Sequence, residues 1–148
     1  MSKIKIKILD NGKGLYKLEK ATIGSAGFDL IAATNNELII NPNSSILVPC
    51  GFSLALPNNF EAQVRPRSGL ALKNMITVLN SPGTIDSDYR GEVCVILINH
   101  SNKIFNISSG MRIAQIIFKT IPNFEIVEVE ELDITERGHG GFGSTGIK

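Results

Sequence analysis

The feature that most constrains this chain is the regular alternation of short β-type segments with turn-forming clusters. Residues 3–9 (KIKIKIL) alternate lysine with apolar residues, which predicts a strand with one buried face. Turn clusters such as NPNSS, LPNN and SPGT separate further segments rich in Ile and Val. We expect these strands at 26–33, 37–41, 45–56, 60–65, 92–99, 112–118 and 124–131. The pattern predicts an all-β sandwich, jelly roll or barrel, with one short helix over 69–75.

The length of 148 residues fits a single domain. The last eleven residues, GHGGFGSTGIK, contain five glycines and follow an acidic stretch with six carboxylates between Glu125 and Glu136. We therefore expect a β domain over residues 1–136 and a flexible C-terminal arm over 137–148 that belongs to the same domain.

Charge and composition exclude several classes. The net charge of +1 gives no strong field toward nucleic acid or anionic lipid. No run of about 18 apolar residues exists to span a membrane, and the N-terminus lacks the apolar core of a signal peptide. The two cysteines, Cys50 and Cys94, have no metal or redox spacing, so we expect reduced thiols in a cytoplasmic protein.

The motifs of covalent and zinc-dependent catalysis are missing. The sequence has no P-loop, HExxH or GxSxG, and its two histidines are too few for a His-based zinc site. Gly141, Gly143 and Gly146 match GxGxxG, but the chain ends two residues later, so no helix can follow as a dinucleotide-binding fold requires.

The glycine-rich end still suits an anion. Backbone N–H groups of such a turn, with the hydroxyls of Ser144 and Thr145, can form a nest for phosphate oxygens. A disordered tail is the ordinary alternative for a terminal Gly/Ser stretch. Arg137 at the start of the arm and Phe142 among its glycines favour the anion site.

Two further segments carry polar groups in turns. In RPRSGLA (65–71), Ser68 is placed to cap the short helix, whose N-terminus offers free N–H groups to an anion. Taken alone, the segment is explained more simply by a helix cap with two solvent arginines. In LNSPGTIDSDYRGEV (79–93), Asp86 beside Tyr89 suits a general base, and the amide of Asn80 suits the edge of a heterocycle. An ordinary Asp- and Gly-rich turn is the alternative there.

Two predicted strands each contain a polar residue among apolar ones. These are Asp29 in SAGFDLIAA (25–33) and Gln115 in GMRIAQIIF (110–118). A buried polar group needs a partner, so a structural hydrogen bond is the simplest role for Asp29.

Together, five segments resemble the five motifs of the trimeric deoxyuridine triphosphatase (dUTPase) family. They are AGFDL, PRSGLA, NSPGTIDSDYRGEV, GMRIAQIIF and RGHGGFGSTG, in the family's order across residues 25–146. The resemblance implies a jelly-roll-like (β-clip) subunit in a homotrimer with active sites at subunit contacts. The implied reaction is hydrolysis of dUTP to dUMP and pyrophosphate, with Mg²⁺ bound to the triphosphate and neither a nucleic acid nor a membrane as partner.

The resemblance also implies residue roles. Asp86 would activate water, Tyr89 would lie under the deoxyribose, and Asn80 with nearby strand backbone would read uracil. Asp29 would act through magnesium-bound water or as a structural group. The remaining implied substrate-binding residues are Arg67, Ser68, Gly69, Thr84, Ile85, Gln115, Arg137, Phe142, Gly143, Ser144 and Thr145. Two positions depart from the family pattern: Met111 stands where aspartate is usual, and His139 where serine or threonine is common.

Three alternatives remain open at this stage. A dCTP deaminase of the same fold would need an acidic residue in the base pocket, and the sequence offers only Asp86 close to Asn80. A non-catalytic nucleotide-binding regulator would fit a chain that lacks Asp86, which is present. A structural or assembly protein without a ligand would have no use for Phe142 within the arm.

Overall fold

The computed structural model describes residues 2–16 and 19–141 and is built almost entirely from antiparallel strands. Along β8 buried and accessible side chains alternate, as the sequence pattern predicts, whereas β10 contains two pairs of consecutive buried residues. In the described ranges the strands are β1 (Lys5–Ile8), β2 (Phe28–Ile31), β3 (Leu38–Ile40), β4 (Ser45–Ala55), β5 (Phe60–Arg65), β6 (Ile76–Val78), β7 (Gly83–Ile85), β8 (Glu92–Asn99), β9 (Phe105–Ile107) and β10 (Arg112–Thr120). A 3-10 turn η1 (Asp10–Gly12) and a helix α1 (Ser68–Asn74) complete the elements.

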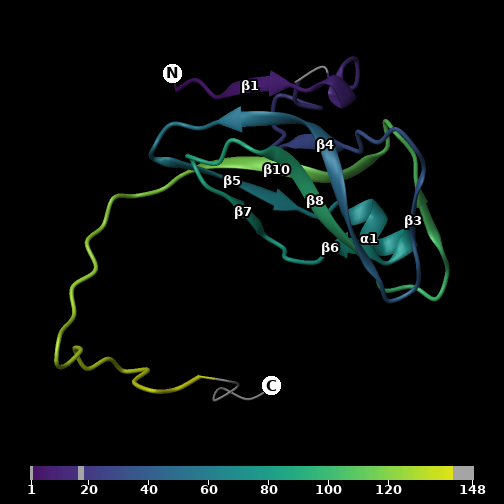
Figure 1. Ribbon diagram of the computed structural model, residues 1–148. Helices are drawn as coiled ribbons and strands as arrows, with labels where there is room; N and C mark the ends of the chain where they lie inside the picture. The colour runs from purple at the N-terminus through teal and green to yellow at the C-terminus, as the bar shows by residue number, and fades with distance from the viewer. Residues whose placement is uncertain (1, 17–18, 142–148) are drawn as a thin grey trace.

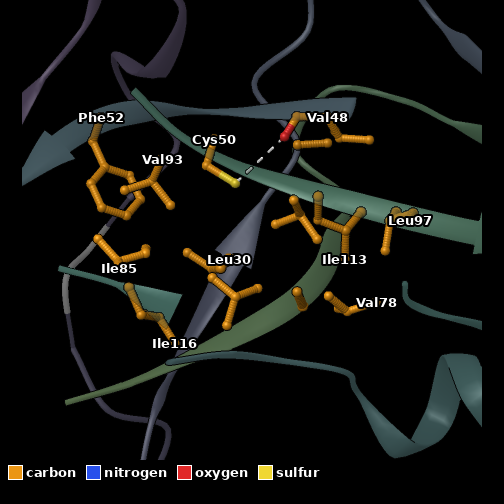
Figure 2. Packing of buried hydrophobic residues seen from close by; sticks show 14 of the residues in the cluster. Leu30, Val48, Cys50, Phe52, Val78, Ile85, Val93, Leu97, Ile113 and Ile116 are labelled. Atoms are coloured by element: carbon orange, nitrogen blue, oxygen red, sulfur yellow. Dashed lines mark hydrogen bonds between the residues drawn. The ribbon is translucent and has the colours of Figure 1, made fainter. Parts of the chain in front are cut away.

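The strands form two four-stranded sheets and one two-stranded sheet. The first has the order β1-β4-β8-β6, the second β2-β10-β5-β7, and β3 pairs with β9 (Figure 1). The two larger sheets share a core, in which Leu30 and Ile113 of the second sheet meet Val93 and Leu97 of the first (Figure 2). The prediction of an all-β domain with one short helix is confirmed.

The N-terminal turn packs very closely on β4. The backbones of Gly12 and Gly51 approach so closely that a Cβ on Gly12 would lie 2.0 Å from the Gly51 carbonyl oxygen. Gly51 has a φ of +74°, a left-handed conformation that glycine adopts without steric cost. The Leu9 N–H donates to the same carbonyl at 2.9 Å. This contact fixes residues 9–12 against the strand that pairs with β8.

Most predicted strands are present, with ends shifted by a few residues. The short strands β6, β7 and β9 were not predicted, because three residues between turns are too few to show a period of two. The predicted helix at 69–75 is found one residue earlier. Among the described residues no helix is long and apolar enough to cross a membrane, and both cysteines are free thiols.

The predicted strand at 124–131 is wrong. Residues 121–139 belong to no strand and are all exposed, and the chain after β10 runs away from the sheets (Figure 1). Its apolar side chains include Phe124 at 73% and Ile126 at 88% exposure. The segment has the alternation of a strand but pairs with no other strand in the described residues. A pattern that satisfies β-propensity does not form a strand without a partner for its backbone N–H and C=O groups.

Candidate active site

A cavity of about 200 Å³ lies between β7 and the start of β8. Five of the predicted site residues line it: Asn80, Thr84, Ile85, Asp86 and Tyr89. The remaining lining residues are Leu47, Val64, Gly83, Glu92, Val93, Cys94 and Ile96. The structure therefore brings the predicted base-reading, sugar-contacting and water-activating residues together in one place.

The wall of the cavity depends on Gly83. In β7 this residue pairs with Val64 of β5. A Cβ on Gly83 would lie 3.3 Å from the Asn80 amide nitrogen and 3.3 Å from the Val64 Cβ. The missing side chain at Gly83 leaves room for the Asn80 amide, a group that can both donate and accept hydrogen bonds.

The loop that follows β7 is braced by its own side chains. The Tyr89 N–H donates to the Asp86 carbonyl at 3.2 Å, and the Tyr89 hydroxyl donates to the Glu92 carbonyl at 3.0 Å. Arg90 Nη1 donates to the carbonyls of Ser87 at 2.7 Å and Tyr89 at 2.8 Å. The loop thus has a defined shape before any ligand binds.

Gly91 allows the Tyr89 ring to fold back on the loop. A Cβ on Gly91 would lie 2.3 Å from the Tyr89 hydroxyl oxygen. The ring is still 45% exposed, so one face remains available to a ligand. The Asp86 carboxylate is exposed, and within the described part of the chain it has no hydrogen-bond or ion-pair partner. It is free to accept a proton from water.

A second group of predicted residues surrounds Asp29. Arg67 Nε lies 3.2 Å from Asp29 Oδ1, and Arg112 Nη1 lies 3.4 Å from Asp29 Oδ2. Arg67 also donates to the Arg112 carbonyl at 3.0 Å. Gln115, opposite Asp29 in the β2–β10 register, donates to the Pro66 carbonyl at 2.9 Å. The carboxylate holds two guanidinium groups side by side.

The prediction that Ser68 caps helix α1 is wrong. The N-cap is Arg67, which makes no side-chain cap bond, and Ser68 is the first helical residue. Because the helix begins at Ser68 itself, one residue earlier than a serine cap requires, the N-cap position falls on Arg67, whose backbone is extended. Ser68 and Gly69 are exposed on the first turn, and nothing lies within 4 Å of the position of a Gly69 Cβ.

The two groups of residues do not share the cavity. Arg67, Ser68 and Gln115 are absent from its lining, although Val64 at the end of β5 contributes to it. Residues 137–141, the part of the arm that the structure describes, are also absent from the cavity lining. Arg137 donates through Nε to the Gly140 carbonyl at 2.8 Å within its own turn, whereas Phe142, Gly143, Ser144 and Thr145 lie outside the described residues.

The described residues offer no preformed metal cage. Within these ranges no three His, Cys, Asp or Glu side chains are grouped so that they could hold an ion. Asp29, the predicted metal contact, is the one carboxylate of its cluster and is paired with two arginines. These residues fit Mg²⁺ only as an ion that arrives with phosphate ligands of its own.

The Cys94 thiol lines the cavity. Burial raises the pKa of the Cys94 thiol, and the charge of Glu92 raises this pKa further. Because thiolate is the reactive form of cysteine, both effects lower the reactivity of this thiol.

Comparisons with known proteins identify the family and agree with the fold. The dUTPase family model matches residues 16–146. A deoxyuridine 5'-triphosphate nucleotidohydrolase of Caulobacter vibrioides is 56% identical over 129 residues, which cover 86% of this chain and 83% of the relative. A protein of the same description from Wolbachia pipientis is 54% identical over 146 residues, covering 97% and 95%.

Solved structures share the architecture at low sequence identity. A dUTPase of Staphylococcus bacteriophage 80alpha with dUpNHpp has a TM-score of 0.87 at 22% identity, covering 99% of this chain and all of that one. A dUTPase of phage phi11 of S. aureus, described with a structural Mg(II) ion, has a TM-score of 0.78 at 18% identity, covering 89% and 99%.

These findings define an antiparallel β-sheet protein with one short helix and a cavity beside β7. The chain belongs to the dUTPase family.

Sequence reasoning assigned no role to Glu92, which lines the cavity. It also named Asp86 as the one carboxylate near Asn80, whereas Glu92 lines the same cavity. Its carboxylate accepts hydrogen bonds from the Asn11 amide at 2.9 Å and the Gly51 N–H at 2.8 Å. No local pattern signals this role, because both donors lie far away in the sequence.

Proposed function

We propose that this chain hydrolyses dUTP to dUMP and pyrophosphate, which limits uracil in DNA and supplies dUMP for dTMP synthesis. The observation that carries the proposal is the exposed Asp86 carboxylate at a cavity that also presents the Asn80 amide and the Tyr89 ring. The relatives described above, at 54–56% identity, bear the name of this activity.

The chemistry follows from the groups present. Asp86 accepts a proton from water while the water oxygen attacks the α-phosphorus, and the bond from that phosphorus to the pyrophosphate oxygen breaks. Such a step needs a positioned water and neutralised phosphate charge more than covalent catalysis. Mg²⁺ bound by the triphosphate would supply much of that neutralisation. Arg67, Ser68 and Gln115 are the candidates to bind the phosphates.

The cavity accounts for the base and sugar only. Pockets for whole ligands commonly measure about 300–1,000 Å³, and this one measures about 200 Å³. The candidate phosphate-binding residues lie outside it. We therefore propose a homotrimer in which Arg67, Ser68 and Gln115 of one subunit complete the cavity of another, and an arm with Arg137, Phe142, Gly143, Ser144 and Thr145 closes over both.

Exposed apolar surface supports this assembly. Leu47 and Ile96, neighbours on the outer face of β4 and β8, line the cavity, and Leu47 is 61% exposed. The unpaired segment after β10 exposes further apolar side chains, among them Ile126 and Val129. Contiguous apolar surface of this kind marks protein contacts.

Pyrophosphate release from dUTP, dTTP, dCTP and UTP tests the proposed reaction, with ammonia release from dCTP measured in parallel. Selective cleavage of dUTP supports it. Ammonia release from dCTP without pyrophosphate release would instead indicate a deaminase.

A mixing experiment tests the shared site. A chain lacking residues 137–148 is refolded together with an Asp86→Asn chain, and light scattering establishes the mass of the mixed oligomer. Activity above that of either parent supports sites built from several subunits. Mixed trimers without recovered activity would place the whole site within one chain.

A further inference from the structure

We infer that Glu92 and Asn11 are positioning residues that hold the Tyr89 ring in place, so that the N-terminal turn contributes to discrimination between deoxyribose and ribose. This inference rests on the proposed function, in which Tyr89 lies under the sugar. A chain of contacts runs from residues 9–12 through the start of β8 to the loop at the cavity.

The first link is the Glu92 carboxylate. One oxygen, Oε1, accepts from Asn11 Nδ2 at 2.9 Å and from the Gly51 N–H at 2.8 Å. Asn11 Nδ2 also donates to the Ala33 carbonyl at 3.1 Å. Hydrogen bonds to an ionised acceptor are stronger and shorter than neutral ones. They connect the first residue of β8 with the N-terminal turn.

The β4 strand is irregular at this place, which explains why the carboxylate is needed. The β4–β8 register shifts between Pro49 and Ser53, so β4 bulges at the same point where Glu92 begins β8. The Gly51 N–H donates to the Glu92 side chain rather than to a backbone carbonyl of β8. Glu92 therefore satisfies a backbone group that the bulge leaves without a ladder partner.

The second link is the backbone of the same residue. The Glu92 carbonyl accepts the Tyr89 hydroxyl at 3.0 Å. The Tyr89 ring lies against Gly91, where no side chain could be accommodated. The ring position is thus set at its hydroxyl end by a residue whose side chain is anchored on the N-terminal turn.

A shift of the Glu92 backbone would move the ring relative to the sugar. A wall that rejects a hydroxyl works only when it is held rigidly, and displacements of about 1 Å can change rates by about 100-fold. Glu92→Ala and Asn11→Ala should therefore lower kcat/KM for dUTP by about tenfold and narrow the ratio of kcat/KM between dUTP and UTP. The mechanism assigns neither side chain a contact with the reacting phosphorus.

The conservative variant Glu92→Gln separates the positioning role of this side chain from an effect of its negative charge. Its amide oxygen can still accept from both Asn11 and Gly51, so the ratio of kcat/KM between dUTP and UTP should stay near that of the wild type. Asn11→Asp places two carboxylates together and should lower the ratio. The double variant Asn11→Asp/Glu92→Gln restores one donor and one acceptor and should recover part of it. Glu37→Ala removes an exposed glutamate outside the cavity lining and serves as the matched control.

The experiment measures kcat/KM for dUTP and UTP, dissociation constants for dUMP and UMP, and melting temperature for each variant. The inference is supported if the ratio of kcat/KM between dUTP and UTP narrows in Glu92→Ala and Asn11→Ala but stays at the wild-type value in Glu92→Gln. An unchanged ratio with a lowered melting temperature overturns it and leaves Glu92 a purely structural residue. If the wild type does not cleave dUTP, the proposed function fails, and the dUMP and UMP affinities still decide the inference.

Discussion

The loop after β7 and the segment after β10 both carry predicted site residues, yet they are held in opposite ways. In the loop, Tyr89 and Arg90 make four hydrogen bonds to carbonyls within residues 86–92. In the segment, residues 121–139 are exposed, and Arg137 bonds only within its own turn. One part of the site has its shape in the single chain, whereas the other depends on contacts with something else.

The two regions are suited to different roles in a site that cleaves a nucleotide. A braced loop can hold a base, a sugar and a water in fixed geometry, which is how positioned groups lower a barrier. A segment with few internal contacts can open and close, which lets substrate enter and excludes water afterward. Variants of the loop after β7 and of the segment after β10 should separate the contributions of positioning and of closure.

The largest effect is expected at the braced loop. Asp86→Asn should lower kcat by about 10²–10⁴-fold, because the amide keeps the shape of the side chain but cannot accept the proton of water. Binding of a non-hydrolysable dUTP analogue and the melting temperature should be retained. Asp88→Asn is the matched control. Near-normal turnover in Asp86→Asn would remove the assignment and make Asp88 the next candidate.

The next effect is expected in the C-terminal segment. Deletion of residues 137–148 should lower dUTP hydrolysis by about 100-fold while the melting temperature hardly changes. The reason is that the exposed residues of this region that the structure describes bury little apolar surface. Calorimetry and a pyrophosphate assay check both parts. A large fall in melting temperature would show that the arm is part of the stable domain, contrary to the comparison.

A smaller effect is expected on specificity. Tyr89→Ala should narrow the ratio of kcat/KM between dUTP and UTP by about 10- to 100-fold, since removing the ring admits the 2′-hydroxyl. Kinetics with the two substrates measure it. If activity falls equally with both, Tyr89 contributes packing and not selection.

The smallest effect is expected at the exposed apolar side chains after β10. Ile126→Ser should weaken oligomer assembly by about 1.5 kcal/mol, because Ile126 would be buried by a neighbouring subunit. Sedimentation equilibrium over a range of concentrations measures this. Ile23→Ser, at another fully exposed isoleucine, is the control and should have no effect. Equal behaviour of both variants would show that Ile126 remains in solvent in the oligomer.

The sequence predicts the long strands well because their alternation reports burial directly. β8 is found at residues 92–99 as expected, with Val93, Val95 and Leu97 buried. The same reasoning fails at 124–131, where the alternation is present but no strand pairs with it. Periodicity describes which face of a segment prefers burial, and it does not say which chain provides the covering surface.

The site residues that could be predicted from the sequence are those within one local motif, whereas those with distant partners were missed. Asp86, Asn80 and Tyr89 were predicted from neighbouring residues in one motif, and the structure places them at one cavity. Glu92 was missed because its partners, Asn11 and Gly51, lie 81 and 41 residues away. The predicted Ser68 cap failed because the helix begins at Ser68 itself, so Arg67 occupies the cap position.

The position of β10 has a consequence for how the chain is made. β10 is the last strand among the residues that the structure describes, yet it lies inside its sheet, between β2 and β5. Neither neighbour can complete its hydrogen bonds on that side until residues 112–120 have left the ribosome. Joining β2 to β10 closes a loop of about 80 residues, and such long-range pairing slows folding. We therefore expect this domain to fold only after residues 112–120 have been synthesised, with the edges of β2 and β5 exposed to chaperones until then.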